Sequence, residues 1–428
     1  MEFPRNPARL TLSELNTAAS TDLLTRTLSP DSFQPISCPV HEDDFGDEIV
    51  GKGQCGTVYA MRCTGKVAKI ANSNLTGGRL LNDNVIHRRV LKALSDTDAE
   101  TKRGINVPEI RGMWHITDIP DDRLEGVVGS WITAAWLPDL CRYALVTDRI
   151  RPVPRDVQAS LVAVLCPPGL RRLAFLNRHR NKSCLIRIYL GRRDCNDERQ
   201  KRSFSDMGLR NFPLHINEME RLRINTGVFA STMARALAIM HWKAGIDGNH
   251  VEFVLGGSPS DQRAAVSSAS AACDSAPSEQ APVGKSSDAA ASKSPDHEMR
   301  SLALWLIDFD QCAAFEHDEA GLKKIVDAFI CNDPYYPRPG PAGTSQQAIW
   351  EIFRGHYLQT SSKFTQSNMP NRFIAAIETR CAESPGDVYW PRMLINTDWP
   401  VVREVARRRA MGACLDPLYL PLDGLQIT

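Results

Sequence analysis

The stretch GKGQCGTVYAMR, residues 51–62, decides which fold the sequence predicts. It spaces Gly51, Gly53 and Gly56 so that the backbone can approach a phosphate without a clash from Cβ. Successive amides of such a loop point at the bound anion, although GxGxxG alone is a weak signal and a plain glycine turn would give the same pattern. Strand-forming residues around Val58 follow the third glycine, so we expect a loop between two strands. A dinucleotide-binding loop would open a helix at that point.

A lysine in the next apolar run is the second signal. Lys69 stands within KVAKIA, where a buried ammonium group is costly unless an anion meets it. The segment LLNDNVIHRRVLKAL, residues 80–94, repeats apolar side chains close to every 3.6 residues, Leu81 and Val85 among them, and predicts a helix. Asp83 on this helix is the candidate partner of Lys69, and the alternative is a carboxylate that faces solvent.

Two acidic motifs follow later in the chain. Asp308 ends the apolar run LALWLIDF, where a carboxylate could face phosphates and hold a cation. Asp247 follows a predicted helix over residues 226–242, and Glu252 comes five residues later at the start of VEFVLG. A carboxylate at that place can coordinate a cation, but its charge repels phosphates until an ion neutralises it. Asn249 is the alternative ligand if the loop takes another register.

Taken in order, these motifs resemble the protein-kinase-like superfamily. The resemblance implies an α+β, two-lobed fold, with a small β-rich N-lobe, a larger helical C-lobe, and ATP and Mg²⁺ between them. Lys69 with Asp83 would contact the phosphates, and Asp308 would hold the metal ion. Thr147 and Asp148, at the end of a predicted strand over residues 143–150, complete the implied nucleotide-binding set.

The match to that superfamily departs from its pattern at the places that perform chemistry. Asp247 takes the place of the catalytic aspartate, but Gly245 and Ile246 replace the His-Arg pair before it. Glu252 stands where a metal-binding asparagine is usual, and Asp310 replaces the glycine of the DFG motif. Asp310 would be either a second metal contact or a solvated side chain. These changes lower the expectation of efficient phosphoryl transfer.

A narrower resemblance is to a fungal family of uncharacterised proteins, the DUF3669 domain. The stretches that carry it are NKSCLIRIYLGRR, LRNFPLHINEM, DGNHVEFVLG, LWLIDFDQC and DPYYPRP. It extends over residues 45–357, and the function of the family is unassigned. DPYYPRP is either a rigid segment after an activation loop or a simple structural turn.

Composition limits the class of protein. The chain has 428 residues and a formal net charge of +1, which argues against a protein that coats nucleic acid. Its twelve cysteines are interpreted as scattered residues, none of them part of a CxxC or CxxH motif. The sequence therefore predicts no zinc site. No secretory signal and no membrane helix is expected, and the predicted location is cytoplasmic or nuclear.

Three parts are expected along the chain. Residues 1–46 predict a flexible N-terminal arm, in which a weak amphipathic patch around residues 10–24 allows one short helix. Residues 47–150 predict an N-lobe, and residues 151–428 a helical C-lobe. Within the C-lobe, a basic insertion near 171–203 is interpreted as solvated, or alternatively as a nuclear-import or nucleic-acid patch. The low-complexity tract 257–299 predicts a disordered loop at the tip of a hairpin.

Two functions of different classes compete. The first is a divergent kinase-like domain that binds ATP and Mg²⁺, with weak phosphotransferase activity or none. The second is a non-catalytic interaction or scaffold module, nuclear or cytoplasmic, that meets protein partners through its low-complexity segments and keeps the fold without nucleotide chemistry. A nucleic-acid-associated factor is the weakest reading, and no membrane partner is expected.

Overall fold

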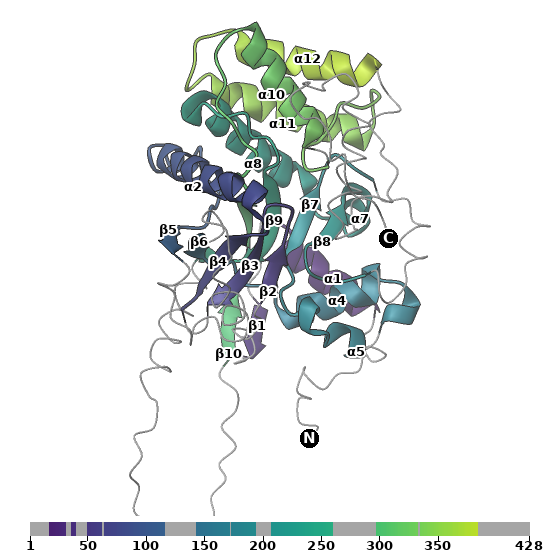
Figure 1. Cartoon of the computed structure of the whole chain (residues 1–428). Helices are drawn as coiled ribbons and strands as arrows, with labels where there is room; N and C mark the ends of the chain where they lie inside the picture. Colours follow the sequence, from purple (N-terminus) through teal and green to yellow (C-terminus); the bar gives the residue numbers. More distant parts are fainter. Residues whose placement is uncertain are drawn as a thin grey trace, which may run out of the picture.

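The computed structural model combines helices and strands in an α+β architecture (Figure 1). It describes residues 17–30, 36–39, 49–61, 64–115, 143–171, 173–193, 207–259, 297–332 and 334–383. The predicted disordered tract 257–299 lies largely outside these residues, since 260–296 are not described. The strands form sheets of five, four and two strands within the described ranges.

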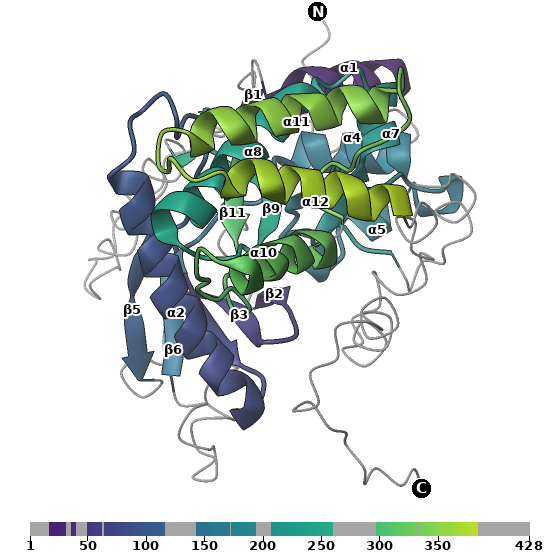
Figure 2. The same cartoon turned by 90° about the horizontal axis from the view of Figure 1, so that it is seen from above.

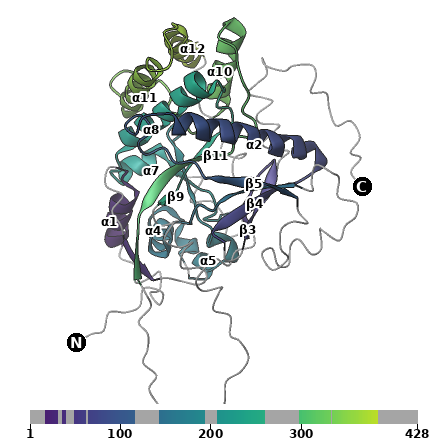
Figure 3. The same cartoon turned by 90° about the vertical axis from the view of Figure 1, so that its left-hand side faces the viewer.

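The five-stranded sheet carries the glycine-rich stretch. Its order is β2 (Ile49–Lys52), β3 (Gly56–Met61), β4 (Lys66–Ala71), β6 (Tyr143–Asp148) and β5 (Ile110–His115), with every neighbouring pair antiparallel. Helix α2 (Asn74–Ser95) runs across one face of this sheet (Figure 3). The predicted order of strand, glycine turn, strand, strand and helix is confirmed.

The apolar face of α2 agrees in part with the 3.6-residue pattern of the sequence. Leu80, Ile86 and Val90 are buried, whereas Leu81 and Val85 are 40% and 60% exposed. Helix α2 packs on the sheet along one narrow stripe of its surface. Apolar residues beside that stripe therefore stay exposed to solvent.

The four-stranded sheet joins segments far apart in the sequence. Its order is β11 (Leu302–Ile307), β9 (Glu252–Gly257), β7 (Ile186–Tyr189) and β8 (Phe212–His215). Strands β9 and β11 are antiparallel, from Leu302 opposite Gly257 to Ile307 opposite Glu252. This pairing confirms the predicted hairpin, with the low-complexity tract connecting its two strands.

Helices cover the far side of this second sheet. They are α4 (Arg155–Leu165), α5 (Leu173–Leu176), α7 (Ile216–Arg221), α8 (Thr226–Ile239), α10 (Glu319–Cys331), α11 (Ser345–Ser361) and α12 (Met369–Glu383). Seen from above, α11 and α12 lie over α8 and the sheet (Figure 2). A cluster of aromatic rings, including Phe329, Trp350, Phe353 and Phe373, joins α10, α11 and α12, and each of these rings is buried. Such aromatic contacts dominate the burial energy of a core.

Part of the predicted N-terminal arm belongs to the folded body. Helix α1 (Thr17–Leu28) packs on α4, and its side chains Leu24 and Leu28 are fully buried in the main core. Strand β1 (Ile36–Pro39) pairs with β10 (His297–Arg300). The expectation of a flexible arm is therefore wrong for Thr17–Leu28, because its leucines find an apolar surface on a helix distant in sequence.

The basic segment is likewise built into the molecule where it is described. Phe175 and Cys184 are fully buried, and Arg187 lies on β7. Arg193 makes two hydrogen bonds, of 2.8 and 2.9 Å, to the carboxylate of Glu220. The expectation of a solvated insertion is wrong for residues 173–193, since their arginines pair internally. Residues 194–206 lie outside the described ranges.

The segment after α10 is a structural connection. Tyr336 is fully buried and its ring stacks on Phe329, with 5.0 Å between the centroids. The backbone amides of Leu190 and Gly191 donate to the carbonyls of Tyr335 and Pro334. These contacts favour the reading of DPYYPRP as a turn that fixes β7 to the helices. No described helix is long and apolar enough to cross a membrane.

Candidate functional site: a cleft between the two larger sheets

A cleft opens between the five-stranded sheet with α2 and the edge of the four-stranded sheet. All the nucleotide- and metal-binding residues expected from the sequence line it: Gly51, Gly53, Gly56, Val58, Lys69, Asp83, Thr147, Asp148, Glu252 and Asp308. Asp247 is not among the lining residues. The structure thus collects residues that are more than 250 positions apart in the sequence, while their roles stay predictions.

The glycine loop is fixed by its own backbone and by one asparagine. The amide of Gly53 donates to the carbonyl of Gly56 at 2.9 Å, and a Cβ on Gly56 would stand 2.6 Å from the Ile70 carbonyl oxygen. The Asn72 amide group donates to the Gly53 carbonyl at 2.8 Å. Only glycine fits at position 56, so the loop takes a close approach to β4 that a side chain would block. Asn72 belongs to no sequence motif, so its contact with the glycine loop could not be predicted from the sequence.

Lys69 is the centre of charge in the cleft. Its Nζ lies 2.6 Å from Asp83 Oδ2 and 2.8 Å from Asp308 Oδ1. Burial acts to lower the pKa of Lys69, but Asp308 and Asp83 outweigh it and hold that pKa well above its ordinary value. Lys69 is therefore a cation, and the alternative of a solvent-facing Asp83 is excluded because Asp83 is buried and paired.

Asp308 follows β11 at the turn into the next segment. Its backbone is left-handed, with φ of 67°, a conformation that aspartate tolerates better than most residues. Burial raises the pKa of the Asp308 carboxyl, against the opposing effect of Lys69. Asp83 Oδ1 also accepts a hydrogen bond of 3.3 Å from the Phe309 amide, so α2 holds this turn in place.

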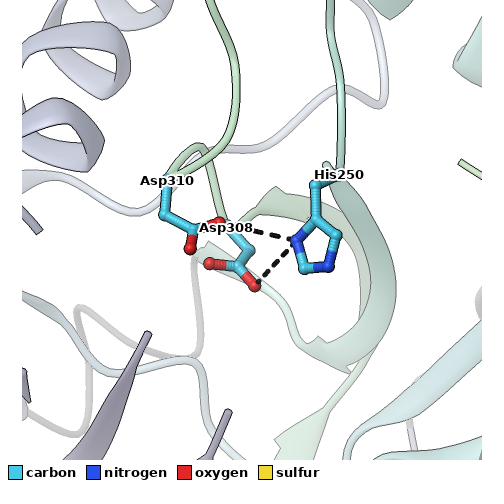
Figure 4. Close-up of side chains that lie close together, drawn as sticks. All are labelled: His250, Asp308 and Asp310. Atoms are coloured by element: carbon cyan, nitrogen blue, oxygen red, sulfur yellow. Dashed lines mark ion pairs between the residues drawn. The ribbon is translucent and has the colours of Figure 1, made fainter. Parts of the chain in front are cut away.

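Two further side chains lie beside Asp308: Asp310, which the sequence offered as a second metal contact, and His250, which it did not. His250 Nδ1 is 3.7 Å from Asp308 Oδ2 and 3.5 Å from Asp310 Oδ1 (Figure 4). Burial acts to raise the pKa of Asp310, but His250 and then Lys69 outweigh it and lower that pKa. Asp310 is buried, which excludes the alternative of a solvated side chain, and its role as a second metal contact stays a prediction. His250 gave no signal in the sequence because its neighbours in space follow a different strand.

Glu252 lines the same cleft from β9, where it pairs with Ile307 next to Asp308. Its Oε2 accepts a hydrogen bond of 2.7 Å from Arg187 on β7, and both side chains are largely buried. Burial acts to lower the pKa of Arg187, and Glu252 outweighs it, so the pKa stays well above its ordinary value. This ion pair commits one Glu252 oxygen to the protein, and its role as a metal ligand stays a prediction.

Asp247 is tied to the backbone beneath the cleft. Its Oδ1 accepts from the amides of Asn249 and Ala313, at 3.1 and 2.9 Å, and burial raises its pKa. The buried His241 ring lies near this loop, with Nε2 3.3 Å from the Asp247 carbonyl oxygen and Nδ1 2.9 Å from the Tyr357 hydroxyl. These hydrogen bonds hold the loop around Asp247 in place. The catalytic role of Asp247 stays a prediction.

Comparison with known proteins gives one family. Residues 304–369 match the model of the DUF3669 family, described as a zinc finger protein. That segment begins in β11, contains Asp308 and Asp310, and ends at the first residue of α12. No curated protein and no solved structure matches the chain.

The family description corrects one prediction. The matched family is described as a zinc finger protein, so the expectation of no zinc is wrong. That expectation rested on the absence of CxxC and CxxH pairs, yet Cys38 and His41 in CPVH do stand in CxxH spacing. Zinc also takes histidine and carboxylate ligands from distant segments, which no local spacing reveals. The match has no bearing on ATP or magnesium.

Proposed function

We propose that the cleft binds a nucleoside triphosphate, and that the chain is a divergent kinase-like domain whose main activity is binding. The observation that carries the proposal is Lys69, held by Asp83 and Asp308 at the wall of a cleft lined by the glycine loop. A fixed lysine beside close backbone amides is the arrangement that recognises phosphate groups.

Charge supports a phosphate ligand at this position. Lys69 is kept protonated by its two partners, so it presents a permanent positive charge to an anion. Asp308 lines the same site and would meet the divalent cation that accompanies a triphosphate. The apolar side chains Val58, Val67 and Leu145 line the cleft and offer a surface for a flat base.

The order of these parts along the chain supports the kinase-like interpretation. Glycine loop, lysine strand, helix with a carboxylate partner, Asp247 loop and Asp308 turn follow one another as in that superfamily. The resemblance of the fold is an analogy, and the function rests on the site itself.

Asp247 favours binding over efficient transfer. The carboxylate is buried and does not line the cleft, and one oxygen accepts from two backbone amides. A group that orients an acceptor hydroxyl has to reach it within hydrogen-bonding distance. Phosphoryl transfer to a protein or small molecule is therefore expected to be slow or absent.

One observation favours the alternative function, a non-catalytic interaction module. The charged groups of the cleft satisfy one another, since Lys69 pairs with Asp308 and Arg187 pairs with Glu252. A ligand would have to compete with these internal bonds. A module that keeps the fold as a scaffold would need no ligand at all.

Isothermal titration of the full chain with ATP and MnCl₂ or MgCl₂ tests the proposal. We expect saturable binding by the wild type and at least tenfold weaker binding by Lys69→Met and Asp308→Asn. Lys66→Met is the matched control on the same strand, and it should bind as the wild type does. Absence of binding to the folded wild type would favour the interaction module, and equal binding by all four chains would place the nucleotide elsewhere.

A further inference from the structure

A mixed nitrogen and oxygen cluster joins Asp308, which lines the cleft, to His250 and Asp310 (Figure 4). His250 comes from the turn before β9, and Asp308 and Asp310 come from the turn after β11. One ligand atom of each, namely Nδ1 of the histidine and one oxygen of each carboxylate, lies within 4.8 Å of the other two.

The distances in this cluster suit ligands of one ion better than a hydrogen-bonded pair. His250 Nδ1 stands 3.5 Å from Asp310 Oδ1 and 3.7 Å from Asp308 Oδ2. A good N–H···O hydrogen bond is about 2.9 Å long. Two ligands on a tetrahedral ion with bonds of about 2.0–2.1 Å lie about 3.3 Å apart.

Two of the three ligand atoms have no other partner. His250 Nδ1 and Asp310 Oδ1 are both buried without a hydrogen bond. The Asp310 side chain is only 1% exposed, so water in the open cleft does not reach it freely. A buried polar atom without a partner costs free energy, and an ion between the two atoms would satisfy both.

The charge balance also calls for a cation. The buried carboxylates of Asp83 and Asp310 and the half-buried carboxylate of Asp308 lie near the ammonium group of Lys69, which pairs with Asp83 and Asp308. Glu252 and Arg187 neutralise each other and do not alter this balance. A divalent cation beside Asp308 and Asp310 would neutralise the remaining negative charge.

We propose that His250, Asp308 and Asp310 bind a divalent transition-metal ion of the manganese and zinc class, without any nucleotide. The imidazole ligand favours such an ion over Mg²⁺ and Ca²⁺, which prefer oxygen ligands only. Asp308 gives Oδ1 to Lys69 and keeps Oδ2 for the ion, so the metal site shares this residue with the proposed nucleotide site but does not depend on it. Three protein ligands leave a coordination position open for water or a phosphate oxygen.

Manganese alone is the probe, because it binds thiolates weakly and this chain has many cysteines. Electron paramagnetic resonance of the full chain with MnCl₂ should show one bound ion, with a nitrogen coupling from one imidazole. Equimolar Zn²⁺ should displace it, and equimolar Mg²⁺ should not. His250→Gln should lose the nitrogen coupling and weaken binding at least tenfold, and Asp310→Asn should weaken it similarly.

The control is His179→Gln, which changes an exposed histidine, and it should leave binding unchanged. Circular dichroism confirms that each variant is folded before titration. The proposal is overturned if the folded wild type binds no Mn²⁺, if His250→Gln keeps the nitrogen coupling, or if equimolar Mg²⁺ displaces the ion. None of these outcomes depends on ATP, so the nucleotide titration fails or succeeds independently.

Discussion

Lys69 holds together two carboxylates that would otherwise repel each other. Asp83 comes from α2 and Asp308 from the turn after β11, so one side chain on β4 connects the two sides of the cleft. Removal of the lysine would leave both carboxylates buried without their common counter-charge. Breaking a buried ion pair in this way usually costs about 3–5 kcal/mol.

We therefore expect Lys69→Met to lower the free energy of unfolding by about 3 kcal/mol, as measured by urea denaturation at pH 7. Lys92→Met is the control, since Lys92 pairs with Asp96 at the exposed end of α2, and exposed ion pairs contribute little to stability. A loss by Lys69→Met as small as that of the control would mean that the three charges are not coupled.

His87 makes the stability of the folded chain depend on pH. Its ring is buried beside Phe309, Nε2 lies 2.8 Å from the Pro108 carbonyl oxygen, and burial lowers its pKa to about 4. The unfolded chain takes up a proton below pH 6.5 and the folded chain does not, so stability is present above pH 6.5 and is lost as the pH falls toward 4. His241, whose pKa burial lowers to about 3, acts in the same direction.

Urea denaturation at pH 7 and pH 5 measures this effect. His87→Gln should lose less stability than the wild type between these two values, by about 2 kcal/mol, because one pKa unit corresponds to about 1.4 kcal/mol. His179→Gln, at an exposed site, should follow the wild type. Identical losses in all three chains would show that His87 titrates normally in the folded state.

The sequence identified those site residues that carry a charge within or at the end of an apolar strand. Lys69 in an apolar strand and Asp308 at a strand end both carry a charge where burial is costly, and each lines the cleft. His250 became a ligand candidate only through its distance from Asp308 and Asp310, because a turn before one strand meets a turn after another. No spacing in one dimension encodes that contact.

At the scale of elements, helix α1 shows how local composition misleads. Residues 17–28 are polar overall, yet Leu24 and Leu28 on one side of the helix are fully buried against the core. Their partner surface on α4 comes more than 100 residues later, so sequence alone could predict the helix but not its docking. The β9–β11 hairpin was predictable because both strands are continuous apolar runs.

Leu24→Ala tests the docking of α1. We expect the free energy of unfolding to fall by about 2–5 kcal/mol, the range for a buried leucine reduced to alanine. Leu81→Ala is the control on an exposed helical position, where the loss should stay below about 1 kcal/mol. Equal losses from the two variants in urea denaturation would mean that α1 does not pack in solution.

At the scale of the whole molecule, the cleft is the meeting place of elements that are independent in sequence. The five-stranded sheet and α2 supply the loop and Lys69, while the four-stranded sheet supplies Glu252 and the Asp308 turn. Binding of a triphosphate there would require all of these parts at once. In the proposed complex, Lys69 is the lysine that contacts the phosphates.

Covalent labelling of the full chain with an acyl-phosphate derivative of ATP measures this claim most directly. The reagent transfers its acyl group to a lysine Nζ held beside the terminal phosphate, and mass spectrometry identifies the lysine. We expect acylation of Lys69 above all other lysines, suppressed by excess ATP, with no new preferred lysine in Asp308→Asn. Labelling of Lys69 no stronger than that of exposed lysines such as Lys92, or labelling that excess ATP leaves unchanged, would contradict this expectation.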